Sequence, residues 1–107
     1  MKILKFGGSS IASAQNIVRV INILKSNPQD SQISVVFSAI GKTTDALIHM
    51  ASKAQLQDDV YNNLLSDLET NHFDIVRQLI PVNNQSGVLS GVKKLFNELE
   101  NILEGVF

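Results

Sequence analysis

The chain opens with the stretch KILKFGGSS, residues 2–10, which predicts a strand over residues 2–6 that ends at a pair of glycines. Glycines at such a point let backbone N–H groups approach a phosphate closely, because no Cβ intervenes. Lys5 offers a full positive charge to a phosphoryl group in transfer, and Ser9 and Ser10 add hydroxyl donors. The same residues also suit an ordinary tight turn between a strand and a helix, and the glycine pair alone favours that simpler interpretation.

The residues that follow predict an alternation of strands and helices. Residues 14–25 have a helical period after an N-cap at Ser13, and the stretch NPQD at residues 27–30 ends that helix. Residues 32–38 are apolar and β-branched, which predicts a second strand, and a helix over residues 43–54 comes next. This βαβα order predicts a parallel sheet with right-handed crossovers. The side chains expected to share the apolar face of the first helix are Ile17, Val18, Ile21 and Leu24.

The second half of the chain is predicted to be helical. Apolar spacing indicates helices over residues 58–80 and 86–106, with Asp58 able to cap the first and Pro81 ending it. No strand signal appears after residue 38. Parallel sheets are normally covered on both faces and have more than two strands, so two strands alone make a poor sheet. The sequence also ends without a polar tail, and we expect it to be part of a longer protein.

A second polar loop, SAIGKTTD at residues 38–45, follows the second predicted strand and opens the next helix. Ligands of open α/β sheets bind at the carboxyl ends of the strands, so both loops should lie at one edge of the sheet. Thr43 or Thr44 could simply cap the helix, but two small, polar loops at one edge favour a ligand site. Gly41-Lys42-Thr43 is not a P-loop, because Val36 stands where that motif needs its first glycine.

Composition excludes several other classes of function. The chain has 107 residues, a net charge of −1, 44% hydrophobic and 18% charged residues, and no cysteine. No basic block indicates nucleic acid and no apolar run could span a membrane, and residues 1–8 are not expected to act as a secretory signal. His49 and His72 lack partners at metal-binding spacing, so no metal site is predicted. We expect one cytoplasmic domain, or part of one.

Taken together, residues 5–10 and 38–45 resemble the two opening motifs of the aspartate kinases, K-F-G-G-[TS]-S and S-A-[hydrophobic]-G-x-x-T-[DN], with one helix between them. The resemblance implies an α/β fold, a partial αβα sandwich of the amino-acid kinase (carbamate kinase-like) type. Residues 1–107 would be the N-terminal part of that domain, with a βαβα segment carrying the site loops at 1–55, a helical segment at 58–107 and the rest of the domain absent. Kinases of glutamate, acetylglutamate, carbamate and uridylate share the Lys-x-Gly-Gly element but generally lack the rest of the motif pair.

The resemblance also implies an activity and its residues. Aspartate kinases transfer the γ-phosphoryl group of ATP, with magnesium, to the β-carboxylate of L-aspartate, which gives 4-phospho-L-aspartate for lysine, threonine and methionine biosynthesis. Lys5 would be catalytic. The residues implied to contact phosphate or ATP are Lys5, Gly7, Gly8 and Ser9, and those implied to contact aspartate are Ser9, Ser38, Ala39 and Thr44. The parent enzyme would be a homo-oligomer and could be a bifunctional aspartokinase/homoserine dehydrogenase.

Departures from the family pattern are small where the motifs lie: Ser9 replaces the commoner Thr, and Ile11 replaces the commoner Val. The family's later elements cannot be matched, namely an acidic substrate contact, an Arg for aspartate, an Asp that orients the Lys, the nucleotide pocket and the regulatory domains. We therefore expect these residues to be inactive alone. The alternative is a stand-alone, non-catalytic module that binds phosphate, or binds a partner through the apolar stripe of residues 88–106.

Overall fold

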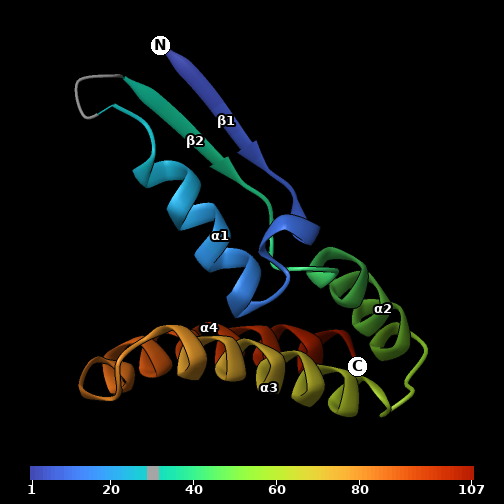
Figure 1. Cartoon of the computed structure of the whole chain (residues 1–107). Coiled ribbons are helices and arrows are strands. Elements are labelled where there is room, and N and C mark those ends of the chain that lie inside the picture. Colours follow the sequence, from blue (N-terminus) through green and yellow to red (C-terminus); the bar gives the residue numbers. More distant parts are fainter. Residues whose placement is uncertain (29–31) are drawn as a thin grey trace. The chain divides into compact units, whose positions relative to one another are not determined.

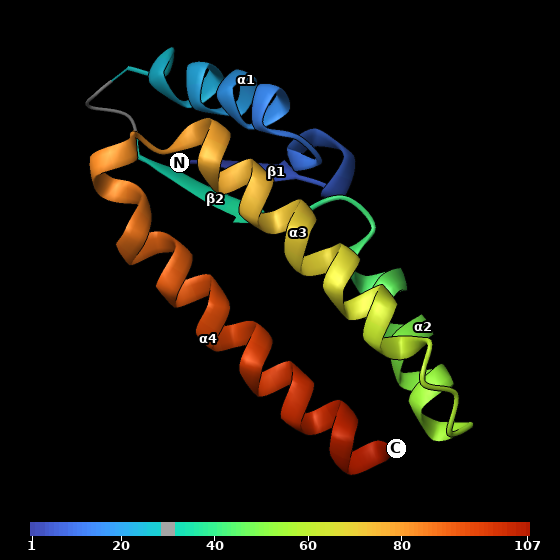
Figure 2. The ribbon, with the colours of Figure 1, turned by 90° about the horizontal axis from the view of Figure 1, so that it is seen from below.

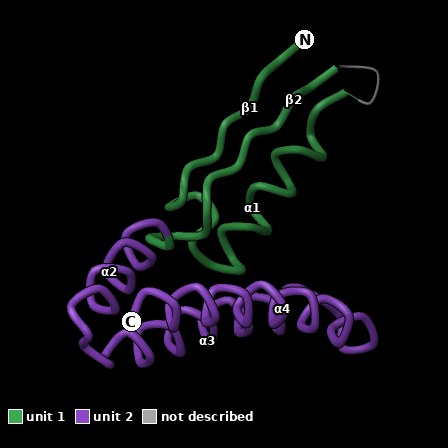
Figure 3. The backbone as a smooth tube through the Cα atoms, turned by 180° about the vertical axis from the view of Figure 1, so that it is seen from behind, with its two compact units in different colours: residues 1–43 green, residues 44–107 purple. Residues whose placement is uncertain are grey.

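The computed structural model describes residues 1–28 and 32–107 of the chain, so the last two residues of the NPQD stretch lie outside the described residues. The described residues divide into two compact units, residues 1–43 and residues 44–107 (Figure 3). None of the described helices is both long enough and apolar enough to cross a membrane.

The first unit is built on a pair of parallel strands, β1 (Lys2–Phe6) and β2 (Ile33–Phe37), as the sequence predicted. Their register runs from Lys2 opposite Ile33 to Phe6 opposite Phe37, and the two phenylalanine rings stack with centroids 5.7 Å apart. A short 3-10 helix, η1 (Gly8–Ile11), leads into α1 (Ala14–Lys25), which lies alongside the sheet and connects the strands (Figure 1). The predicted N-cap is confirmed, since Ser13 Oγ accepts from the N–H of Asn16 at 3.2 Å.

The buried face of α1 differs from the one the sequence predicted. Val20 is buried, with 4% of its surface exposed, whereas Val18 and Ile21 are 45% and 40% exposed. Ile17 and Leu24 are half-buried. A line through residues 17, 20 and 24 has the alternating three- and four-residue spacing of a single helix face, and Val18 and Ile21 lie to one side of it. The prediction was therefore right for Ile17 and Leu24 but wrong for Val18 and Ile21, and it missed Val20 at the centre of the buried face.

The sheet is covered on one face only within this unit. Leu4 and Phe6 are half-buried, while Ile3 and Val36 are 61% and 50% exposed. Alternate residues of a strand point to opposite faces, so Ile3 and Lys5 share the exposed face with Val36, which is paired with Lys5. The structure thus agrees with the expectation that two strands make an incomplete sheet.

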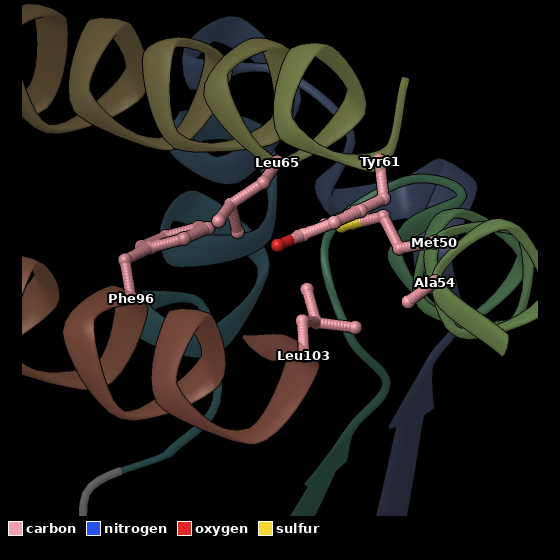
Figure 4. Close-up of a cluster of buried hydrophobic side chains, with 6 residues drawn as sticks. All are labelled: Met50, Ala54, Tyr61, Leu65, Phe96 and Leu103. Carbon is pink, nitrogen blue, oxygen red and sulfur yellow. The ribbon is translucent and has the colours of Figure 1, made fainter. Parts of the chain in front are cut away.

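The second unit is helical. It contains α2 (Thr43–Gln55, with its first residue in the first unit), α3 (Tyr61–Leu79) and α4 (Val82–Val106). α3 and α4 lie side by side as a hairpin (Figure 2). Their core also includes α2, because Met50 and Ala54 are fully buried (Figure 4). The buried cluster consists of Met50, Ala54, Tyr61, Leu65, Phe96 and Leu103.

Two predicted helix starts were wrong. α3 begins at Tyr61 rather than at residue 58. Asp58 lies in the turn before the helix, where its Oδ1 accepts from the N–H of Val60 at 3.0 Å. α4 begins at Val82 rather than at residue 86, directly after Pro81 has ended α3. Its first turn is polar, so apolar periodicity could not reveal it. Gln85 secures that turn by donating to the carbonyl oxygen of Ile80 at 2.7 Å.

Candidate functional site

The loops that follow β1 and β2 are joined backbone to backbone. The N–H of Ser38 donates to the carbonyl oxygen of Phe6 at 2.9 Å, which extends the strand pairing by one step. The N–H of Gly41 then donates to the carbonyl oxygen of Gly8 at 3.0 Å. The two motifs therefore meet at the carboxyl end of the sheet, where parallel strands bring their outgoing loops together.

Gly8 is required by this close approach. A Cβ on Gly8 would lie 2.3 Å from the carbonyl oxygen of Gly41 and 3.1 Å from that of Ala39. Both neighbours are backbone atoms, so neither could swing aside as a flexible side chain would. Gly41 has its own requirement, since its φ of +57° is in the left-handed region that glycine adopts most readily. Gly8 is therefore explained by the packing of the two loops against each other, and Gly41 by its backbone conformation.

Gly7 has no such explanation within the described residues. Its φ of −76° and ψ of 175° suit any residue, and a Cβ there would meet nothing within 4 Å. Gly7 is also the N-cap of η1, without a side-chain hydrogen bond to the start of that helix. The first N–H groups of a helix have no partner inside the helix, so these are available to an external acceptor. An uncrowded position therefore coincides with the start of a helix, whose first N–H groups have no partner inside that helix, and this arrangement suits an anionic ligand.

The remaining predicted site residues are exposed. Lys5, Ser9, Ser38 and Ala39 all belong to the first unit, and none of the ion pairs found among the described residues involves Lys5. Thr44 is exposed in the first turn of α2 and is the first residue of the second unit. The structure thus brings six of the predicted residues together in one unit: Lys5, Gly7, Gly8, Ser9, Ser38 and Ala39.

Among the hydrogen bonds of the described residues, neither the Thr43 nor the Thr44 hydroxyl accepts from a backbone N–H at the start of α2. Thr43 instead donates its hydroxyl to the carbonyl oxygen of Ile40 at 2.5 Å, which closes the turn before α2. Among residues 1–28 and 32–107, no three His, Cys, Asp or Glu side chains gather closely enough to hold a metal ion.

Asn16 was missed by the sequence interpretation. It lies in the first turn of α1, and its Nδ2 donates to the carbonyl oxygen of Ser9 at 3.1 Å. Arg19 Nη1 in turn donates to Asn16 Oδ1 at 3.2 Å. Both side chains line an open hollow of about 290 Å³ beside Phe6 and Ser10. Side chains of a helix tilt toward its N-terminus, so a polar residue in the first turn of α1 can reach back to the loop before it. The position of Asn16 shortly after the glycine loop was the signal that could have indicated this contact.

Comparison with known proteins identifies the class of protein to which this fold belongs. The model of the Amino acid kinase family matches residues 1–101, and the chain belongs to that family. Its relatives are aspartokinases. The chain is 38% identical, over 117 aligned residues and 99% of its length, to the bifunctional aspartokinase/homoserine dehydrogenase of Buchnera aphidicola subsp. Acyrthosiphon pisum. It is 31% identical, over 97% of its length, to the chloroplastic aspartokinase 1 of Arabidopsis thaliana.

The similarity extends to the chloroplastic bifunctional aspartokinase/homoserine dehydrogenase 1 of Zea mays, at 27% identity over 96% of the chain. In every case the chain spans a small part of the relative: 13% of the Buchnera protein, 18% of the Arabidopsis protein and 11% of the Zea mays protein. The sequence thus corresponds to one segment of much longer polypeptides.

Proposed function

We propose that this chain is the N-terminal part of the kinase domain of an aspartate kinase. The activity is the transfer of the γ-phosphoryl group of ATP to the β-carboxylate of L-aspartate. The observation that carries the proposal is the junction of the two motif loops at the carboxyl end of the sheet, in a chain that resembles aspartokinases along nearly its whole length. The similarity does not favour a stand-alone binding module.

The proposal gives each site residue a role. Lys5 is exposed near the end of β1, where its charge would stabilise the phosphoryl group in transfer. Gly7 and its neighbouring N–H groups would contact the phosphates of ATP, while Gly8 keeps the loops close enough to form one site. The residues assigned to aspartate are Ser9, Ser38, Ala39 and Thr44. Magnesium is proposed only as the ion that binds together with ATP.

Catalysis in this proposal needs groups beyond the described residues. No acidic partner for Lys5 is found among them, and the sheet is open on the face that carries Lys5. The remainder of a longer polypeptide would supply the nucleotide pocket and cover that face. Such a parent is proposed to be cytoplasmic and homo-oligomeric, and its fusion to a homoserine dehydrogenase is one form it could take.

The test is a chimera in which residues 1–107 replace the matching segment of the Buchnera relative. Hydroxylamine traps an acyl phosphate, so aspartate-dependent hydroxamate formation reports the kinase reaction directly. The homoserine dehydrogenase activity of the same polypeptide serves as the folding control. The proposal expects hydroxamate from the chimera and none from the 107 residues alone. A chimera that retains its dehydrogenase activity but forms no hydroxamate would count against it.

A further inference from the structure

Two side chains of α1 form a hydrogen-bonded chain that ends on the glycine loop. Arg19 Nη1 donates to Asn16 Oδ1 at 3.2 Å, and Asn16 Nδ2 donates to the carbonyl oxygen of Ser9 at 3.1 Å. These partners also fix the orientation of the amide. Turned over, it would set its NH₂ group against a guanidinium and its oxygen against a carbonyl oxygen, which is two repulsive contacts in place of two hydrogen bonds.

The bond to Ser9 acts on a peptide plane of the loop. The carbonyl of Ser9 and the N–H of Ser10 belong to one rigid peptide unit. Asn16 holds the carbonyl end, and the N–H end donates to the carbonyl oxygen of Gly7 at 3.1 Å. The other donor to Ser9, the N–H of Ala12, is more distant at 3.5 Å. Asn16 therefore makes the shorter of the two bonds that fix this carbonyl.

The asparagine is itself well anchored. Its backbone N–H donates to Ser13 Oγ at 3.2 Å, which ties it to the N-cap of α1. Asn16 as a whole is half-buried, whereas the loop that it holds is mostly exposed. An exposed loop that must present N–H groups to a ligand binds better when its conformation is fixed beforehand, because less conformational freedom is then lost on binding.

We propose that Asn16, oriented by Arg19, is a positioning residue that fixes the Gly7–Ser9 loop for phosphate contact. The positioning itself is a property of this chain, and its consequence for catalysis rests on the proposed kinase function. Asn16→Ala removes the bond to Ser9. Asn16→Asp keeps an acceptor for Arg19 but sets an oxygen against the Ser9 carbonyl, so it should disturb the loop at least as much.

Asn27, which lies just beyond the C-cap of α1, provides a matched control. Its Nδ2 donates to the carbonyl oxygen of Ile23 at 3.1 Å, which is the same length as the bond from Asn16 to Ser9. Asn27 is also half-buried. Asn27→Ala therefore deletes the same kind of bond from α1 without touching the loop.

The experiment has two readouts. In the 107-residue chain, NMR measures exchange of the Ser10 and Ala12 backbone amides. Faster exchange is expected in Asn16→Ala and Asn16→Asp but not in Asn27→Ala. In the chimera, each Asn16 variant should lower kcat/KM for ATP by about three- to tenfold, as expected for one lost hydrogen bond, and leave KM for aspartate unchanged.

Each outcome is decisive for the positioning role. Exchange that is unaltered in both Asn16 variants, or equally raised in Asn27→Ala, would overturn it. So would an equal loss of kcat/KM in Asn16→Ala and Asn27→Ala. A chimera without kinase activity in its unsubstituted form would instead refute the proposed function, and amide exchange would still decide whether Asn16 positions the loop.

Discussion

The backbone N–H of Gly41 donates to the carbonyl oxygen of Gly8 at 3.0 Å. The loop after β1 and the loop after β2 are therefore a single structure, although 32 residues lie between the two glycines in the sequence. A ligand that contacts one loop lies beside the other.

Gly8→Ala should destabilise the chain. Its Cβ would lie 2.3 Å from a backbone oxygen that can move only if the loops separate. We expect the free energy of unfolding to fall by about 1–3 kcal/mol, as for other overpacking substitutions. Urea unfolding followed by circular dichroism measures this, and an unchanged midpoint would show that the two loops do not pack as described.

Gly7→Ala should separate stability from activity. Because the φ of Gly7 is −76° and a Cβ there meets nothing within 4 Å, the free energy of unfolding should be unchanged or raised by about 0.4–1 kcal/mol. In the chimera, however, the added methyl group would hinder approach of a phosphate to the loop, and we expect hydroxamate formation to fall about tenfold or more. Full kinase activity in this variant would remove Gly7 from the proposed site.

Gly41→Ala tests the turn before α2. A residue with a Cβ is strained at a φ of +57°, which should cost about 1–2 kcal/mol of stability. Gly91→Ala is a suitable control, because Gly91 lies within α4, where a Cβ meets nothing within 4 Å and alanine is the better helix former. Urea unfolding should give opposite signs for the two variants, and a stabilising Gly41→Ala would contradict the left-handed turn.

The helical core should depend strongly on Phe96 and hardly on its neighbour. Phe96 is 7% exposed, whereas Leu95 is 64% exposed on the same helix. Phe96→Ala should lower the free energy of unfolding by about 3–5 kcal/mol through the cavity it leaves. Leu95→Ala should change it by no more than about 0.5 kcal/mol. Similar losses for the two variants would place Leu95 in a buried contact.

Much of the fold could be predicted because local signals agreed with one another. β1, α1 and the parallel pairing follow from an apolar run, a capped helical period and a second apolar run. The rotation of α1 could not be predicted. Several apolar residues surround Val20 on that helix, and only the sheet it packs against decides which of them are buried.

The location of the candidate site could be predicted from the sequence, but the packing and the hydrogen bonds within it could not. The strand order implied that the loops meet, and the motifs indicated phosphate chemistry. Neither signal distinguished Gly8, where a Cβ would collide with backbone, from Gly7, where a Cβ would meet no described atom within 4 Å. The bond from Asn16 to Ser9 could not be predicted, because it depends on how η1 turns the chain back toward α1. A helix as short as η1 leaves no periodic pattern in the sequence.

If Lys5 stabilises the phosphoryl group in transfer to aspartate, its loss should slow the kinase reaction far more than the loss of Lys2, and Lys5→Ala is therefore compared with Lys2→Ala in the chimera. Both lysines are exposed on β1. We predict that aspartate-dependent hydroxamate formation falls by about a hundred- to a thousandfold in Lys5→Ala. Lys2→Ala should stay within about twofold of the unsubstituted chimera, with homoserine dehydrogenase activity intact in both. Near-normal hydroxamate formation by Lys5→Ala would show that Lys5 does not stabilise the phosphoryl group in transfer.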